Sequence, residues 1–121
     1  MATTAEQLVE AIAAKDAAGL AALLDAQVSF KGLTPRRFWE ADDPAGVVAV
    51  FGQWFEPSDH VDRLVSMEVG EDVSGMHRVG YRLELSNEDG PQVVEQQAYF
   101  TERDGRIDYL RIVCSGFRAR D

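Results

Sequence analysis

Residues 93–115, VVEQQAYFTERDGRIDYLRIVCS, hold two runs rich in β-branched and aromatic residues on either side of a short polar stretch. Such runs are typical of β-strands. The dipeptide Asp104-Gly105 between them is a strong signal for a two-residue hairpin loop. This stretch therefore predicts two long antiparallel strands, over residues 93–102 and 107–115, joined by a tight turn.

Two further strands are predicted upstream of this hairpin. Apolar and polar residues alternate over residues 61–69 and again over residues 79–85, as they do in half-buried strands. Ser74-Gly75 predicts the turn between them, and the residues NEDG at 87–90 predict the loop that leads into the next strand. The second half of the chain is therefore interpreted as a meander of four antiparallel strands.

The first half of the chain begins with helical signals. Thr3 and Glu6 have the spacing of a capping box, which predicts a helix that ends near Lys15. Asp16 is placed to cap a second, short helix. Alternation over residues 27–31 predicts a short strand after it.

Two Pro-containing dipeptides follow. Thr34-Pro35 has the pattern of an N-cap followed by Pro at the first helical position, and it predicts a helical turn through Trp39. Asp43-Pro44 repeats this signal more strongly. The apolar residues over 47–55 then recur at the spacing of an amphipathic helix, which Pro57 stops.

Helices followed by a meander of antiparallel strands indicate the α+β class. A helix layer must cover one face of the sheet, because helices and sheet each have an apolar side to bury. We expect one domain over residues 1–121, in which three N-terminal helices pack on a curved, mainly antiparallel sheet and close a cone around a cavity.

The composition narrows the class of protein. The chain has 121 residues, of which 45% are hydrophobic and 27% charged, as in ordinary globular domains. Its net charge of −9 argues against nucleic acid or an anionic membrane as partner. The single cysteine excludes an internal disulfide and favours a cytoplasmic location. No phosphate loop, zinc-protease motif or dinucleotide fingerprint is present, so no cofactor is expected.

The order of these elements resembles the nuclear-transport-factor-2-like superfamily, in particular its SnoaL-like bacterial members. The resemblance is carried by LVEAIAAKD at 8–16, LAALLD at 20–25, the third helix and DGRI at 104–107. It covers nearly the whole chain and implies a cone-shaped pocket between sheet and helices and, in many members, a homodimer. The members include isomerases, dehydratases, cyclases, epoxide hydrolases and non-catalytic binding domains, so the resemblance implies a fold rather than one reaction.

The resemblance argues against two mechanisms. The ketosteroid isomerases of this superfamily use an aspartate base near the place of Gly32, a hydroxyl donor at the place of Leu8 and a second acid near Gln97. None of these three residues carries the required group. The Asp-Arg-Asp set of limonene-epoxide-hydrolase-like enzymes has no counterpart that we can place.

The register of the last hairpin decides which side chains face the pocket. A two-residue loop pairs Arg103 with Arg106 and, in a regular ladder, Glu95 with Cys114, and cross-strand partners share a face. The resemblance favours this face as the concave one. With Phe51 and Trp54 from the third helix, the expected ligand-binding residues are Gln97, Tyr99, Leu110, Ile112 and Cys114. A shift of one residue would instead bring Gln96, Ala98, Phe100, Tyr109 and Arg111 to the pocket.

Glu95 and His60 are the candidate catalytic residues. A desolvated Glu95 carboxylate would suit general acid or base chemistry, whereas pairing with Arg82 would make the same residue structural. His60 and Asp62 lie two apart on one strand face, which is compatible with a catalytic dyad or with an edge pair in water. A metal site would need at least three converging ligands, and none is predicted.

Other residues have both a structural and a functional interpretation. Cys114 is a core thiol or a nucleophile, although no adjacent base is assured. Arg36 and Arg37 are surface residues or reach an anionic ligand near the pocket mouth. Trp39 and Trp54 are core residues or a ligand platform.

The assembly and the function follow as expectations. Phe100, Tyr109, Arg111 and Val113 would line the convex face of the sheet, and exposed aromatic residues beside an arginine predict a homodimer through it. The chain is expected to bind a small, partly apolar metabolite, with acid–base activity of the isomerase, dehydratase or cyclase type. The alternative is a non-catalytic, dimeric ligand-binding or scaffold domain, and an interior without converging acids would favour it.

Overall fold

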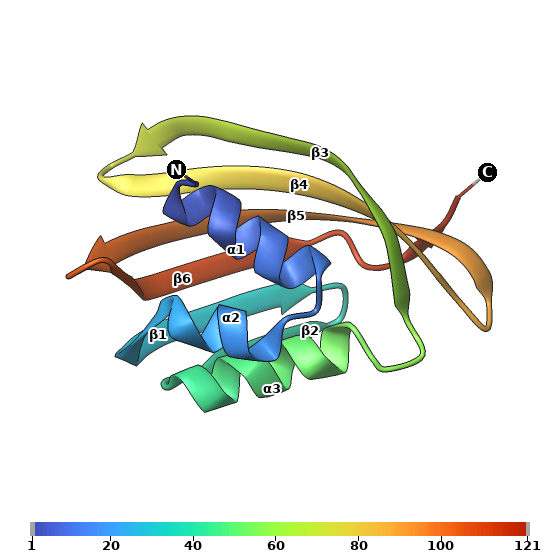
Figure 1. The fold of residues 1–121 in the computed structure, drawn as a ribbon, viewed down its shortest axis with the longest axis horizontal. Coiled ribbons are helices and arrows are strands. Elements are labelled where there is room, and N and C mark those ends of the chain that lie inside the picture. The colour runs from blue at the N-terminus through green and yellow to red at the C-terminus, as the bar shows by residue number, and fades with distance from the viewer. Residues whose placement is uncertain (1, 121) are drawn as a thin grey trace.

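A curved sheet carries three helices on one of its faces (Figure 1). The computed structural model describes residues 2–120. The helices are α1 (Thr4–Ala13), α2 (Ala17–Ala22) and α3 (Pro44–Trp54). The strands are β1 (Leu24–Thr34), β2 (Arg37–Ala41), β3 (His60–Val73), β4 (Met76–Asn87), β5 (Gly90–Arg103), β6 (Arg106–Cys114) and β7 (Arg118–Ala119). The predicted class, α+β with three helices on a curved, mainly antiparallel sheet, is confirmed.

The strands follow the order β2-β1-β6-β5-β4-β3 across the sheet, and β7 pairs with the start of β5. All neighbours are antiparallel except β1 and β6, which run parallel. Register shifts interrupt the pairing of β3 with β4, and such bulges bend a strand. Figure 1 shows the result, with β3 curling over the helix-covered face toward α3.

The predicted helix starts are confirmed. The Thr3 hydroxyl accepts a hydrogen bond from the Glu6 amide, and the Glu6 carboxylate accepts one from the Thr3 amide, which completes the capping box. Asp16 and Asp43 cap α2 and α3 by accepting from backbone amides three residues on, at 2.9 and 2.7 Å. No helix among residues 2–120 is long and apolar enough to cross a membrane.

The helical turn predicted at Thr34-Pro35 is wrong. Thr34 pairs with Arg37, so Pro35 and Arg36 form a two-residue turn between β1 and β2, and Trp39 lies on a strand. Arg36 has a φ of 74°. Proline followed by a residue of positive φ is the pattern of a type II turn, which favours Pro at its first central position as strongly as a helix start does.

One extra residue changes the register of β5 and β6. The two-residue loop at Asp104-Gly105 is confirmed, because Arg103 pairs with Arg106. Beyond it, Glu102 pairs with Ile107 but Thr101 pairs with Tyr109, so Asp108 forms a bulge. The Thr101 hydroxyl donates to the Asp108 carboxylate at this bulge.

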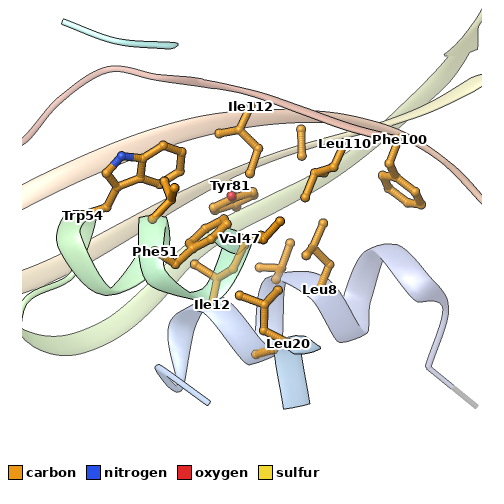
Figure 2. Packing of buried hydrophobic residues seen from close by; sticks show 14 of the residues in the cluster. Leu8, Ile12, Leu20, Val47, Phe51, Trp54, Tyr81, Phe100, Leu110 and Ile112 are labelled. Atoms are coloured by element: carbon orange, nitrogen blue, oxygen red, sulfur yellow. The ribbon is translucent and has the colours of Figure 1, made fainter. Parts of the chain in front are cut away.

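The face of the sheet that the helices cover, called the concave face here, carries the core. Buried side chains from α1, α2, α3 and the strands form one cluster between the layers. Figure 2 shows part of it, with side chains of the helices meeting those of the sheet; the labelled residues are Leu8, Ile12, Leu20, Val47, Phe51, Trp54, Tyr81, Phe100, Leu110 and Ile112. The opposite, convex face carries no helix (Figure 1).

Two glycines test how tightly this core is packed. A Cβ atom at Gly32 of β1 would lie 2.7 Å from the Trp54 ring, whereas one at Gly52 of α3 would meet nothing within 4 Å. Gly32→Ala should lower the free energy of unfolding by about 1–3 kcal/mol, because a packed aromatic ring must move. Gly52→Ala should raise it by about 0.5–1 kcal/mol through its helix propensity. Urea unfolding measures both, and equal effects at the two positions would contradict the packing.

Candidate functional site

Three polar side chains form a row across the concave face. Tyr81 of β4 is the direct cross-strand partner of Gln96 of β5, and Gln96 is the partner of Cys114 of β6. The Tyr81 hydroxyl donates a 2.6 Å hydrogen bond to Oε1 of Gln96. All three residues are buried, with Gln96 only 2% exposed. We call Tyr81, Gln96 and Cys114 the polar row.

Burial keeps the Tyr81 phenol in its protonated form. The pKa of Tyr81 is raised well above its ordinary value of 10.0, mainly by desolvation and also by the neighbouring Cys114. The phenol therefore acts as a hydrogen-bond donor at neutral pH. Its proton polarises the Gln96 amide and makes the amide N–H a stronger donor.

Two buried donors at this end of the core have no hydrogen-bond partner among residues 2–120. They are Nε2 of Gln96 and the indole Nε1 of Trp54. The other buried nitrogens without a partner belong to the guanidinium groups of Arg78 and Arg120. An unsatisfied buried donor costs about 1–3 kcal/mol, so an acceptor atom that reached the Gln96 or the Trp54 donor would be bound favourably.

A cavity of about 500 Å³ adjoins the polar row. Trp54 and Cys114 line it on the core side, and its rim is formed by residues 34–36 and 115–118. This volume lies in the range of about 300–1,000 Å³ that is usual for small-molecule sites. A hollow of about 130 Å³ between the three helices, with Ile12, Lys15 and Phe51 among its lining residues, is smaller than that range.

Two turns meet across the rim of this cavity. Gly116 has a φ of 79°, and a Cβ atom placed on it would lie 2.8 Å from Cγ of Pro35. Ser115 is tied to β5, since its amide donates to the Glu95 carbonyl and its hydroxyl accepts from the Glu95 amide. The backbones of both turns therefore define the opening.

The structure brings five of the predicted ligand-binding residues to the concave side. Leu110, Ile112 and Cys114 of β6 and Phe51 and Trp54 of α3 are all buried there. In Figure 2, Trp54 and Phe51 point from α3 toward the sheet, and Tyr81 points from the sheet into the same core. Trp54 contacts Phe51 edge to face, with ring centroids 4.8 Å apart.

The predicted inward placement of Glu95, Gln97 and Tyr99 is wrong. The bulge at Asp108 shifts the register by one, so these three side chains lie on the convex face. Glu95 is exposed, and its Oε1 accepts a 2.8 Å hydrogen bond from Nε of Arg82 and forms an ion pair with Nη2 at 2.6 Å. The structural interpretation of Glu95, as a strand residue paired with Arg82, is the one that the contacts support.

His60 lies apart from the polar row. It is largely exposed at the start of the edge strand β3, 3.6 Å from Asp62, and it pairs with Ser86 of β4 on the convex side. Asp62 in turn binds Arg120 at 2.7 Å. The structure therefore does not bring the two predicted catalytic residues, His60 and Glu95, to the cavity. Among residues 2–120, no three His, Cys, Asp or Glu side chains are grouped to hold a metal ion.

The two arginines expected near the mouth differ in position. Arg36 lines the cavity. Arg37 instead stacks on the Trp39 ring, with its guanidinium carbon 3.6 Å from the ring centre. Trp39 donates to the Thr34 hydroxyl at 2.8 Å and packs edge to face against Trp54, which places it in the wall behind the rim.

Sequence reasoning misses Tyr81 and gives Gln96 only as the alternative for a register shifted by one, although one signal for that shift was available. Ile107 and Leu110 are both buried and three residues apart. Inward-facing residues of a regular strand are separated by an even number, so this spacing indicates a bulge. Shifting the register there turns Gln96 inward in place of Glu95.

Comparison with known proteins shows similarity at the level of the fold. No protein-family model matches the sequence, and no curated protein matches it. A proposed isomerase from Rhodopseudomonas palustris is 19% identical with a TM-score of 0.73, over 96% of this chain and 92% of that one. A proposed polyketide cyclase from Xanthomonas campestris is 18% identical with a TM-score of 0.70, over 91% and 86%. An M. tuberculosis protein described as an LEH-like epoxide hydrolase is 13% identical with a TM-score of 0.67, over 93% and 80%.

The chain therefore has the nuclear-transport-factor-2-like fold in its SnoaL-type form. At these identities the likeness extends to the fold and to no particular reaction. A proposal about function therefore rests on this chain's own polar row and on the cavity beside it.

The Tyr81–Gln96 hydrogen bond should make stability depend on pH. Because the folded-state pKa of Tyr81 is raised, its contribution is fully present below the unfolded pKa of about 10 and is lost as the pH rises above it. Tyr81→Phe should lower the free energy of unfolding by about 1–3 kcal/mol at pH 7, because it leaves Gln96 without its donor. The free energy of unfolding of this variant should also fall less steeply at alkaline pH than that of the unaltered chain. Tyr99→Phe is the matched control on the convex face, and equal pH profiles for the two variants would contradict this account.

Proposed function

We propose that the chain binds a small, partly apolar molecule whose acceptor oxygen meets the unpartnered donors of Gln96 and Trp54. The observations that carry this proposal are the two buried donors without acceptors and a cavity of ligand size, which is lined by Trp54 and by Cys114, the cross-strand partner of Gln96. Trp54 offers only an N–H, and the carbonyl of Gln96 already accepts from Tyr81, so both free groups are donors. A ketone, ester or amide oxygen is the matching group.

The apolar part of the ligand would pack against the aromatic wall of the cavity. Trp54 and Phe117 both line it, and Phe117 packs on Phe55 with ring centroids 5.7 Å apart. Such a wall with few, directed polar groups is typical of small-molecule sites.

The proposal favours binding over acid–base turnover. The polar row holds a phenol, an amide and a thiol, and it contains no carboxylate or imidazole. The raised pKa of Tyr81 suits it to donate a hydrogen bond rather than to exchange a proton near neutral pH. Proposed isomerases and cyclases share this fold, and a catalytic role here would have to use groups other than Glu95 and His60.

We further propose that two copies associate through the convex face. Phe38, Leu33 and Val113 are adjacent in register on β2, β1 and β6 and are 54%, 52% and 48% exposed. Phe100, predicted for this face, is instead buried in the core, while Tyr109, Arg111 and Val113 do face outward. Exposed apolar patches of this kind are typical of protein–protein interfaces.

The ligand proposal is tested with two probes that differ in one oxygen, 1-indanone and indane. In a ¹⁵N-labelled sample, 1-indanone should shift the Trp54 indole and Gln96 amide resonances and bind about tenfold more tightly than indane, which matches two net hydrogen bonds. The Trp39 indole, which already donates to Thr34, is the internal control.

Gln96→Met keeps the volume of the side chain and removes the amide. The variant should keep only part of the preference for 1-indanone, because the Trp54 donor remains, while Gln97→Met on the convex face should behave like the unaltered chain. Equal affinities for the two probes in the unaltered chain, or shifts confined to other residues, would contradict the proposal.

The assembly proposal is tested by light scattering. The unaltered chain should show twice the 13.4 kDa mass of one chain at micromolar concentration, and Leu33→Glu with Val113→Glu should reduce it to one. Val69→Glu is the control, because Val69 is 58% exposed but belongs to the concave side through its pairing with Val79. A single-chain mass for the unaltered protein would exclude this dimer.

A further inference from the structure

The rim of the cavity has a charge opposite to that of the protein. Two charged residues line the cavity, Arg36 and Arg118, and none of its described lining residues is acidic. The chain as a whole has 21 acidic residues and 12 basic ones. A cavity lined by two arginines and by no acidic residue therefore differs in charge from the acidic chain as a whole.

Neither arginine is neutralised by the protein. Among residues 2–120, Arg36 and Arg118 take part in no ion pair and in no side-chain hydrogen bond. Arg120, two residues along the chain, differs sharply: it binds Asp62 at 2.7 Å and Glu84 at 3.1 Å. Carboxylates thus satisfy an arginine next to this rim, and the two that face the cavity have none.

The two arginines reach the rim from unrelated parts of the chain. Arg36 lies in the turn between β1 and β2, where its φ of 74° places it after Pro35. Arg118 begins β7, which pairs with Val93 of β5. The sheet order and the contact of Gly116 with Pro35 bring both to one opening. Two arginines that line one cavity favour an anion, since guanidinium groups donate charge-assisted hydrogen bonds to its oxygens.

Resting on the proposed function, we infer that the ligand of this cavity is anionic: an apolar molecule with an acceptor oxygen at one end, held by Gln96 and Trp54, and a carboxylate at the other, held by Arg36 and Arg118. The buried donors form hydrogen bonds with the neutral oxygen at the base of the cavity. The arginines bind the carboxylate at its mouth, where they stay in contact with water. Ligand class is thereby restricted to small oxo acids with an apolar body.

Three probes separate this inference from the proposed function: 3-oxoindane-1-carboxylic acid, its methyl ester and 1-indanone. Calorimetric titration should show the acid binding about tenfold or more tightly than the ester, as expected for a charge-assisted contact. That preference should shrink as sodium chloride rises from roughly 20 mM to roughly 0.5 M, because exposed charges are screened.

The double variant Arg36→Gln with Arg118→Gln should bind the acid and the ester equally, while still preferring 1-indanone over indane. Arg106→Gln, at the hairpin turn on another part of β6, is the control and should keep the preference for the acid. Thermal unfolding of each variant checks the fold. The salt titration on the unaltered chain tests the inference without any substitution.

The outcomes are distinct. If the ester binds as tightly as the acid, or if the double variant keeps the preference, the anionic ligand is excluded while the binding of a neutral carbonyl compound stands. If none of the three probes binds, the proposed function itself fails. If the acid binds tightly without shifting the Gln96 and Trp54 resonances, the arginines form an anion site separate from the polar row, which overturns the two-ended ligand.

Discussion

One extra residue in β6, Asp108, sets which side chains of the central hairpin meet the helices. A strand presents alternate residues to opposite faces, so a single bulge exchanges the two faces of everything paired beyond it. Here it pairs Ala98 with Ile112 and Phe100 with Leu110, which gives the helices an apolar surface to cover. The same shift sends Glu95 outward to Arg82 and brings Gln96 inward to Tyr81. The core and the polar row thus have a common origin.

The polar row is a departure from an otherwise apolar interior. Its inner hydrogen bond, from Tyr81 to Gln96, satisfies one acceptor but leaves an amide N–H without a partner, and the indole of Trp54 adds a second. An interior built for stability alone would replace these groups by hydrocarbon, because unsatisfied buried donors oppose folding. The proposed function gives the arrangement a use. In it the protein holds donors ready near a cavity lined by Trp54 and Cys114, and the ligand completes their hydrogen bonds.

Local signals predicted most of the fold. Capping at Thr3, Asp16 and Asp43 and the hairpin turn at Asp104-Gly105 rest on interactions within a few residues, and all are present. The site was harder, because it depends on the register between strands. The loop predicted at residues 104–105 is correct, but the prediction assumes a regular ladder beyond it. The bulge at Asp108 instead places Glu95, Gln97 and Tyr99 on the face opposite to the predicted one. The odd spacing of the apolar residues Ile107 and Leu110 indicates this bulge in the sequence.

The contact between Gly116 and Pro35 has a consequence for how the cavity exchanges its contents. The two turns that frame the opening touch through backbone and ring atoms, so the aperture is governed by residues that take no part in recognition. Loops of this kind vary more freely than the strands that carry them. Position 116 is an exception, because a side chain there would be strained by the positive φ and would clash with the Pro35 ring. The width of the opening is therefore set by a steric constraint between positions 35 and 116, which is separate from the polar row at strand positions 81 and 96.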